Sequence, residues 1–352
     1  MTTHGRRQFL RWSLGGAAAG FAWRPGRGAA AGAGDKAGVK LPEGKMPMRP
    51  LGRTGVKVSL VGLGGYHIGQ APDQQTATRI IRAAIDHGVN FMDNCWDYND
   101  GKSHVWMGHA LRDGYRKRVF LMTKIDGRTR KAAADQIDQS LRDLGTDAID
   151  LIQVHEVIRA SDPDRVFGPD GAIEALVAAK KAGKVRFIGF TGHKSPSIHL
   201  KMLEAAAAHR FAFDTVQMPV NVMDAHYDSF GQRVLPAATK AGAAVLAMKP
   251  LGSGLFMRSG PITAREISPT DCLRYAMDTQ ASVVITGCES MRDLAQALDA
   301  AYGFAPMTDA QRKSLLAHTA PAAAKGQWEK YKVSEMFDGT ARNPHWLETA
   351  KL

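Results

Sequence analysis

Residues 119–156 read VFLMTKIDGRTRKAAADQIDQSLRDLGTDAIDLIQVHE, and the pattern of this stretch decides the fold. It begins with the apolar run VFLMTKI at 119–125 and ends with the apolar run AIDLIQVHE at 148–156. Between them, apolar side chains recur at helical spacing over residues 134–144. Short strands that are apolar along their whole length belong to parallel sheets covered on both faces. The stretch therefore predicts a strand–helix–strand unit.

The same alternation continues along most of the chain. A second helical pattern covers residues 76–86, where the apolar side chains line one face. The apolar strand runs occupy 58–64, 90–95, 119–125, 148–156, 185–192, 215–221, 243–250 and 282–288. Eight strand–helix units in about 240 residues predict an α/β protein with a (β/α)8 TIM barrel, a parallel eight-stranded barrel. An open, doubly wound sheet is the alternative.

Composition supports a globular protein without metal centres. The chain has 352 residues, of which 44% are hydrophobic and 23% charged, so it can bury a large core without disulfides. Cys95, Cys272 and Cys288 are scattered and form no C-x-x-C pair. The pair His155-Glu156 begins like a zinc-protease motif, but the second histidine is missing. We therefore predict no metal site.

The net charge of +12 is concentrated at the N-terminus. Residues 1–34 carry five arginines and no acidic residue, which leaves +7 for the rest of the chain. Small basic runs on such a surface are usually solvated faces. We therefore predict no nucleic-acid binding.

The N-terminus resembles a twin-arginine signal peptide, which we place at residues 1–34. The segment GRRQFLRW at 5–12 contains an arginine pair, and a short apolar run rich in Gly and Ala follows at 14–23. A spanning helix needs about 20 apolar residues, so we expect a removable leader and no stable membrane insertion. The resemblance implies export of the folded protein by the twin-arginine machinery to the periplasm. A disordered basic tail on a cytoplasmic protein is the alternative.

Polar residues interrupt the apolar strands near their C-terminal ends, where barrel enzymes place their chemistry. Such residues lie in or after six of the strand runs: Asp93, Lys124, His155, Thr191, Gln217 and Lys249. A buried charge without a partner costs several kcal/mol. We therefore expect these side chains to satisfy one another.

Asp93, Tyr98 and Lys124 predict acid–base chemistry. The segment between Asp93 and Tyr98 is rich in turn formers, so the chain can leave the sheet and return Tyr98 over the barrel mouth. A phenol has a pKa near 10, and a neighbouring ammonium can lower it. We expect Lys124 to lower the pKa of Tyr98 by a few units, which asks about 3–5 kcal/mol of that ammonium. Asp93 would hold Lys124, and His155 would hydrogen-bond a substrate oxygen.

Asp93, Tyr98, Lys124 and His155, following consecutive strands, resemble the catalytic tetrad of the aldo-keto reductases. Five further segments agree with this family: RPLGRTGVKVSLVGLGG at 49–65, YNDGKSHVWMGHAL at 98–111, LRDLGTDAIDLIQVHE at 141–156, GKVRFIGFTGH at 183–193 and MKPLGSGLF at 248–256. The resemblance places the barrel at residues 48–320 and a C-terminal tail at 321–352. A bacterial group of similar oxidoreductases includes members with a cysteine-ligated cluster near the C-terminus, but this tail has no cysteine. We expect no cluster.

The resemblance implies hydride transfer between a reduced nicotinamide and the carbonyl of an aldehyde or ketone, without a metal. In that role Tyr98 donates the proton, Lys124 lowers its pKa, Asp93 anchors Lys124, and His155 orients a small-molecule carbonyl substrate. An alternative from another class is a nicotinamide-binding redox sensor or accessory subunit with little turnover.

The resemblance also implies a track for the nicotinamide end of the cofactor. Gly64, Gly65 and Tyr66 would line the ribose, because small residues let a dinucleotide approach the backbone. Thr191 and Gln217 would contact the carboxamide.

Residues after the last two strand runs would bind the rest of the cofactor. Met248 replaces the usual aromatic residue over the nicotinamide, a role its polarizable sulfur permits. Lys249 and the amides of the following loop would meet the pyrophosphate. That loop contains Leu251, Gly252, Ser253 and Gly254.

The nucleotide preference depends on the start of the last helix. Ser290 and Arg292 would meet the 2′-phosphate of NADP there. The neighbouring Glu289 and Asp293 would repel that phosphate. We expect NADP by resemblance, and NAD stays open.

The substrate pocket is expected at the barrel mouth. Tyr66, Trp96 and His193 would shape it, and an aromatic lining of this kind fits many aldehydes and ketones.

Overall fold

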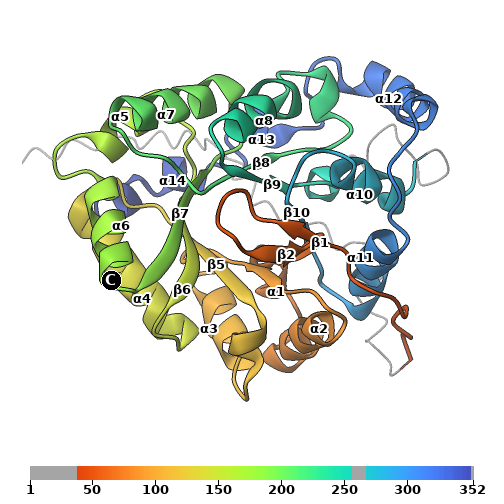
Figure 1. The fold of residues 1–352 in the computed structure, drawn as a ribbon, viewed down its shortest axis with the longest axis horizontal. Coiled ribbons are helices and arrows are strands. Elements are labelled where there is room, and N and C mark those ends of the chain that lie inside the picture. The colour runs from red at the N-terminus through yellow and green to blue at the C-terminus, as the bar shows by residue number, and fades with distance from the viewer. Residues whose placement is uncertain (1–37, 256–266, 350–352) are drawn as a thin grey trace, which may run out of the picture. The chain divides into compact units, whose positions relative to one another are not determined.

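The computed structural model describes residues 38–255 and 267–349 (Figure 1). The predicted leader, residues 1–34, lies outside the described residues. The strands close into a barrel in the order β10-β3-β4-β5-β6-β7-β8-β9, and each neighbouring pair is parallel. The predicted (β/α)8 barrel is confirmed, and the alternative prediction of an open, doubly wound sheet is wrong.

Each barrel strand lies inside one of the predicted apolar runs. The strands are β3 (Val61–Gly64), β4 (Phe91–Asp93), β5 (Phe120–Ile125), β6 (Ile149–Val154), β7 (Val185–Thr191), β8 (Thr215–Pro219), β9 (Ala244–Met248) and β10 (Val283–Gly287). Most of their residues are buried, because one face packs in the barrel interior and the other against helices.

The first predicted run, 58–64, contains two separate strands. Its start belongs to β2 (Lys57–Ser59), which pairs antiparallel with β1 (Met48–Pro50), and its end forms β3. Leu51 and Val58 of this hairpin join the cluster of barrel-interior side chains. The hairpin closes the N-terminal end of the barrel, which leaves the C-terminal ends of the strands for a functional site.

Helices surround the barrel (Figure 1). They are α1 (Gly65–Ile68), α2 (Gln74–Asp86), α3 (Lys102–Ala110), α4 (Arg130–Leu144), α5 (Asp162–Phe167), α6 (Ala172–Lys181), α7 (Pro196–Ala208), α8 (Phe230–Lys240), α10 (Pro269–Met277) and α11 (Met291–Tyr302). The predicted apolar face of α2 is buried. Side-chain caps at Asp73 and Thr129 start α2 and α4, and Gly145, in the left-handed conformation, ends α4.

The chain after α11 stays within the same compact unit as the barrel. It forms α12 (Asp309–Ala323), α13 (Lys330–Val333) and α14 (Gly339–Arg342). The boundary that we placed after residue 320 falls inside α12. Residues 326–349, which we name the tail segment, contact loops that follow β5, β7 and β8, through Arg128, His193 and Asn221. The tail segment therefore covers part of the barrel mouth.

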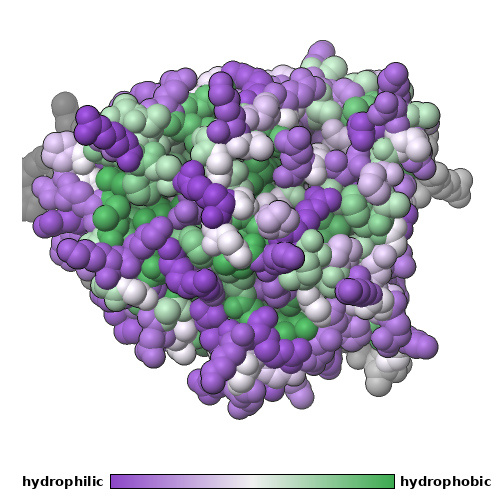
Figure 2. Space-filling model, viewed as in Figure 1, coloured by the Kyte–Doolittle hydropathy of each residue, from purple (hydrophilic) through white to green (hydrophobic). Residues whose placement is uncertain are grey.

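The surface in the view of Figure 1 intersperses hydrophilic and apolar side chains (Figure 2). Such mixing is ordinary for globular proteins. In the described part of the chain, no helix has both the length and the apolar character that a membrane span requires.

Candidate active site

Lys124 joins Asp93 and Tyr98 at the C-terminal end of the barrel. Its Nζ lies 2.7 Å from Asp93 Oδ1, 2.7 Å from the carbonyl oxygen of Asn94 and 3.2 Å from the Tyr98 hydroxyl. Asp93 ends β4 and Lys124 lies in the neighbouring β5, so adjacent strands bring the ion pair together. A turn after β4 returns Tyr98 over Lys124, as the sequence predicted.

The pKa of Tyr98 is shifted upward, whereas we expected a net lowering. Burial raises the pKa of Tyr98 well above its usual value, and the negative charges of Asp93, Asp97 and Glu156 raise it further. The ammonium of Lys124 pairs with the Asp93 carboxylate, and the negative charge of Asp93 offsets much of the effect of the ammonium on the phenol. Tyr98 is therefore protonated throughout the neutral range, the state that a proton donor needs.

His155 lies at the same mouth, with its ring centroid 5.9 Å from that of Tyr98. Its Nδ1 lies 3.0 Å from Asp126 Oδ1 and 3.9 Å from Asp97 Oδ1. Burial disfavours the charged ring, but the carboxylates of Asp126 and Asp97 outweigh burial and raise the pKa of His155. Because Nδ1 is held by Asp126, the Nε2 atom remains for a substrate oxygen.

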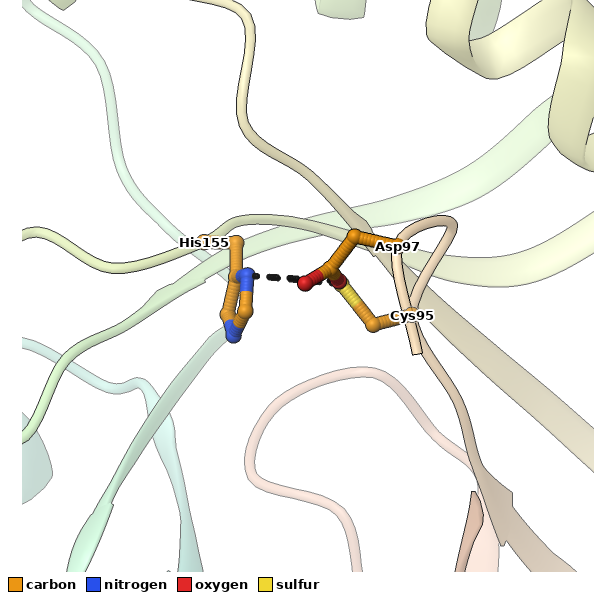
Figure 3. Close-up of side chains that lie close together, drawn as sticks. All are labelled: Cys95, Asp97 and His155. Carbon is orange, nitrogen blue, oxygen red and sulfur yellow. Dashed lines mark hydrogen bonds and ion pairs between the residues drawn. The ribbon is translucent and has the colours of Figure 1, made fainter. Parts of the chain in front are cut away.

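The turn before Tyr98 supplies two further groups to His155. Figure 3 shows Cys95 and Asp97, both from this turn, facing the imidazole ring. Cys95 Sγ lies 3.3 Å from His155 Nδ1. Burial and the charge of Asp126 raise the pKa of Asp97 to about 6. One imidazole nitrogen is therefore surrounded by a thiol and two carboxyl groups.

This cluster has the donor atoms of a metal site. One ligand atom each from Cys95, Asp97 and His155 lies within 4.8 Å of the others. However, Asp126 already bonds to Nδ1, and Asp126 is itself fixed by a 2.6 Å hydrogen bond from Trp96 Nε1. We therefore assign Asp126 and Asp97 the roles of orienting the His155 ring and raising its pKa.

Sequence reasoning missed Asp97 and Asp126 as parts of the site. The signal was present, because Asp126 directly follows the strand run at 119–125 and Asp97 precedes Tyr98. The same rule that selected Lys124, a polar residue at a strand end, also applies to Asp126.

Three of the expected cofactor residues lie side by side at the rim. Thr191 and Gln217 are register partners on β7 and β8, and Thr191 Oγ1 lies 4.0 Å from Met248 Sδ. Gln217 Nε2 donates to Asp93 Oδ2 at 2.8 Å, whereas its Oε1 is buried without a hydrogen-bond partner among the described residues. A carboxamide N–H group is the donor that this oxygen lacks, so the three residues fit a nicotinamide.

Gly64 and Gly65 lie where β3 passes into α1, next to the tetrad. A Cβ on Gly65 would lie 2.5 Å from the carbonyl oxygen of Asp93, so packing against β4 by itself requires glycine here. Tyr66 is 43% exposed, and its ring contacts Tyr98 edge-on at 5.4 Å between centroids. Tyr66 therefore borders the outer side of the phenol.

Lys249 faces aromatic rings of the tail segment. Its Nζ lies 5.3 Å from the ring centroid of Tyr331 and 4.9 Å from that of Phe337. Burial lowers the pKa of Lys249 to about 8. No carboxylate of the described residues lies within ion-pair distance of this ammonium. The adjoining Leu251 and η3 (Gly252–Gly254), with Ser253 at a φ of 57°, form a tight turn before residues 256–266, which are not described.

Of the two residues expected to bind a 2′-phosphate, Ser290 already uses its hydroxyl to cap a helix. Ser290 caps the N-terminus of α11; its hydroxyl accepts from the Asp293 amide and donates to the Asp293 carboxylate. The side chain of Arg292 is exposed. The carboxylate of Asp293 also accepts from the Glu289 and Ser290 amides, so this terminus already carries a negative charge.

Two of the three expected pocket residues are covered. Trp96 is fully buried, with the ring of Trp346 packed edge-on at 5.7 Å. His193 is buried and lies 3.0 Å from Asp338 of the tail segment. The tail segment lies over both side chains, so a role for them in shaping the pocket stays a prediction. Tyr66 alone of the three remains exposed.

Comparison with known proteins agrees with this geometry. Residues 60–298 match the model of the Aldo/keto reductase family. L-galactose dehydrogenase of Arabidopsis thaliana is 30% identical over 247 residues, which cover 64% of this chain and 72% of that protein. The 6-dehydroglucose reductase of Novosphingobium aromaticivorans is 28% identical over 251 residues, 66% of this chain and 77% of that protein.

Solved structures give the same fold. The aldo-keto reductase AKR11C1 from Bacillus halodurans, in its holo form, superposes with a TM-score of 0.65 at 23% identity. The match covers 81% of this chain and 99% of that structure. It extends over most of the chain and supports the barrel assignment.

Proposed function

Since the chain belongs to the Aldo/keto reductase family, we propose that it is a nicotinamide-dependent oxidoreductase that interconverts a carbonyl compound and an alcohol. The observation that carries this proposal is the contact of the Tyr98 hydroxyl with Lys124, 3.2 Å apart, beside the Asp93–Lys124 pair. His155 faces the same space. A proton donor and a second polar group thus flank one position at the barrel mouth.

Thr191, Gln217 and Met248 would hold the nicotinamide, and the buried Oε1 of Gln217 supports this assignment. Lys249 and the loop at 251–254 would lie toward the pyrophosphate. We propose NADP as the cofactor, with Ser290 and Arg292 near its 2′-phosphate. The cap formed by Asp293 supports NAD as the alternative. The ratio of kcat/KM for NADPH and NADH distinguishes the two.

When bound, the nicotinamide supplies or accepts a hydride. Tyr98, which burial and nearby carboxylates keep protonated, donates its proton to the carbonyl oxygen during reduction. Lys124 donates a hydrogen bond to the Tyr98 oxygen and so stabilises the phenolate that forms. Asp126 and Asp97 raise the pKa of His155 and so favour its protonated form, which donates from Nε2 to the same carbonyl oxygen and orients it.

We propose a hydroxylated carbonyl compound, such as a sugar or sugar-derived aldehyde, as the substrate class. Two relatives are named for such compounds, L-galactose and 6-dehydroglucose. The mouth offers Tyr98, His155 and Tyr66 as polar groups around the reacting position. Hydroxyl groups of a sugar can hydrogen-bond to such a rim.

We also propose that residues 1–34 direct export through the twin-arginine machinery to the periplasm. The arginine pair and the short apolar run support this proposal. Because this route exports folded proteins, a cofactor bound before export could accompany the chain. Fractionation of cells expressing the full chain, with the arginine pair replaced by lysines as the control, tests the localisation.

The activity is tested by following reduced-nicotinamide absorbance with aldoses and simple aldehydes. The Tyr98→Phe variant should lose at least about 100-fold in kcat, since a general acid contributes 10²–10⁴-fold. Tyr115→Phe, which removes a hydroxyl bonded to Asp86 on the barrel exterior, is the matched control and should keep its activity. A protein that binds nucleotide but reduces no carbonyl would support the redox-sensor alternative, and absence of nucleotide binding would refute both.

A further inference from the structure

The residue that follows His155 has an unusual backbone and a buried carboxylate. Glu156 has a φ of 45°, in the left-handed region that non-glycine residues rarely adopt. Its carboxylate accepts hydrogen bonds from the Gly339 amide at 2.8 Å, the Thr340 amide at 2.7 Å and the Thr340 hydroxyl at 2.6 Å. All three donors belong to the tail segment, more than 180 residues away in sequence. Distant parts of the chain thus meet next to the candidate active-site histidine.

The main chain at this point is held from the barrel side as well. Arg128 Nη2 donates to the carbonyl oxygens of His155 and Glu156, at 2.8 and 2.9 Å. Arg128 is buried and pairs with Asp162 at 2.9 Å. The next amide, of Val157, donates to the carbonyl of Thr191. The left-handed conformation of Glu156 persists because the surrounding contacts hold it. Arg128 and Thr191 hold the main chain from the barrel side, and Gly339 and Thr340 of the tail segment hold the Glu156 carboxylate.

A second connection runs from the tail segment to the other side of the imidazole. Trp346 packs on Trp96, whose Nε1 donates to the Asp126 carboxylate that holds His155 Nδ1. Gln136 links Asp126 to Trp346, because its side chain accepts from the Asp126 amide and donates to the carbonyl of Trp346. The tail segment thus reaches His155 through its backbone neighbour and through its carboxylate partner.

We propose that Glu156 is a positioning residue for His155, and that Gly339 and Thr340 of the tail segment complete this function. The carboxylate bound by the tail fixes the left-handed turn that aims the imidazole at the mouth beside Tyr98. The kinetic consequences rest on the proposed function. The orientation and charge of His155 are measurable without turnover.

The charge of Glu156 also acts on His155 directly. Among the described residues, the carboxyl groups of Asp97 and Asp126, the thiol of Cys95 and the phenol of Tyr98 face the imidazole, and the Glu156 carboxylate acts on it electrostatically. Since each carboxylate favours the imidazolium, loss of the Glu156 charge should lower the pKa of His155. Loss of the Thr340 hydroxyl keeps that charge but loosens its attachment.

Three substitutions and one control test the proposal in the full chain. Glu156→Gln removes the charge, Thr340→Val removes the hydroxyl, and Thr340→Ser restores it. Glu348→Gln breaks an ion pair with Arg165 that also ties the tail segment to the barrel, away from His155. We expect kcat to fall about tenfold in Glu156→Gln and about threefold in Thr340→Val. Thr340→Ser and Glu348→Gln should stay within about twofold of wild type.

Two readouts separate positioning from general stability. Nucleotide Kd should change less than about twofold in the Thr340 and Glu348 variants, because they keep the Glu156 charge that favours the Lys249 ammonium and leave the Gln217 region unaltered. NMR titration of histidine-labelled protein should place the His155 transition at lower pH in Glu156→Gln. The alkaline limb of the pH–rate profile, where His155 loses the proton that it donates, should move in the same direction, while Glu348→Gln moves neither.

The outcomes are distinguishable. Wild-type kcat, pH profile and His155 titration in folded Glu156→Gln would overturn the proposal, and so would equal losses in Glu348→Gln. If Glu156→Gln does not fold, the two Thr340 variants decide. A loss of kcat in Thr340→Val that persists in Thr340→Ser would refute a role for the hydroxyl. If the wild type reduces no carbonyl, the proposed function fails, and the His155 titration still decides the positioning role.

Discussion

Replacing Asp93 with asparagine should destabilise the barrel far more than breaking an equally short surface ion pair. The Asp93–Lys124 contact is 2.7 Å long, and its two side chains are 4% and 1% exposed. Removing one partner of a buried pair leaves an uncompensated charge and costs about 3–5 kcal/mol. Lys124 keeps two oxygen acceptors, the Asn94 carbonyl and the Tyr98 hydroxyl, so we expect the lower end, about 3 kcal/mol.

The matched control is Asp113→Asn. Asp113 pairs with Arg82 at the same 2.7 Å, but Asp113 is 75% exposed. Exposed pairs contribute less than about 1 kcal/mol. Urea unfolding of both variants at neutral pH measures the two free energies directly. Equal losses in the two variants, or a loss below about 1 kcal/mol in Asp93→Asn, would refute the view that burial sets the strength of this pair.

Three further predictions concern protons and the cofactor. Because the pKa of Tyr98 is raised, ionisation of Tyr98 should not slow carbonyl reduction at any pH up to about 9. Alcohol oxidation, which needs the ionised phenol, should accelerate as the pH rises. Rates measured in both directions test this. The pKa of Asp97 is raised to about 6, so its ionisation destabilises the fold above that pH and not below about pH 4. Asp97→Asn should therefore gain about 3 kcal/mol at pH 7.5 and little at pH 4 in urea unfolding, and an equal gain at both pH values would contradict the assignment. Gln217→Leu, which removes the buried Oε1, should weaken nucleotide binding about tenfold by fluorescence titration, while Gln232→Leu, at a site that bonds to an exposed loop carbonyl, should not.

The barrel was predictable because its signal is local. Each strand run is short, apolar and followed by helical spacing, so eight repeats fixed the topology. The exception lies at Leu60, where one apolar run serves both the β1–β2 hairpin and β3. Val58 of β2 packs in the barrel interior, whereas Val61 and Leu63 of β3 pack in the layer shared with the helices. All three side chains are apolar and buried, so hydrophobicity alone does not mark the break.

The Asp93–Lys124–Tyr98 arrangement followed from the rule that polar strand ends share one mouth. The direction of the Tyr98 pKa did not follow from that rule. It depends on how many carboxylates surround the phenol, and Glu156 is among them only because the main chain turns sharply after β6. The tail contacts were equally hidden, since Thr340 pairs with a residue 184 positions away.

The same carboxylates act on both ionisable groups that would meet the substrate. Asp97 and Glu156 raise the pKa of the Tyr98 phenol, and they also raise the pKa of the His155 imidazole. The negative environment thus favours the neutral phenol of Tyr98 and the protonated imidazole of His155, and in each group it favours the form that holds the proton. A mouth that carries both protons is suited to delivering one to a carbonyl oxygen. Donating that proton leaves Tyr98 as a phenolate among those charges, and withdrawing a proton from an alcohol starts from the same phenolate. Lys124, which donates a hydrogen bond to the phenol oxygen, therefore stabilises the ionised state that both directions share.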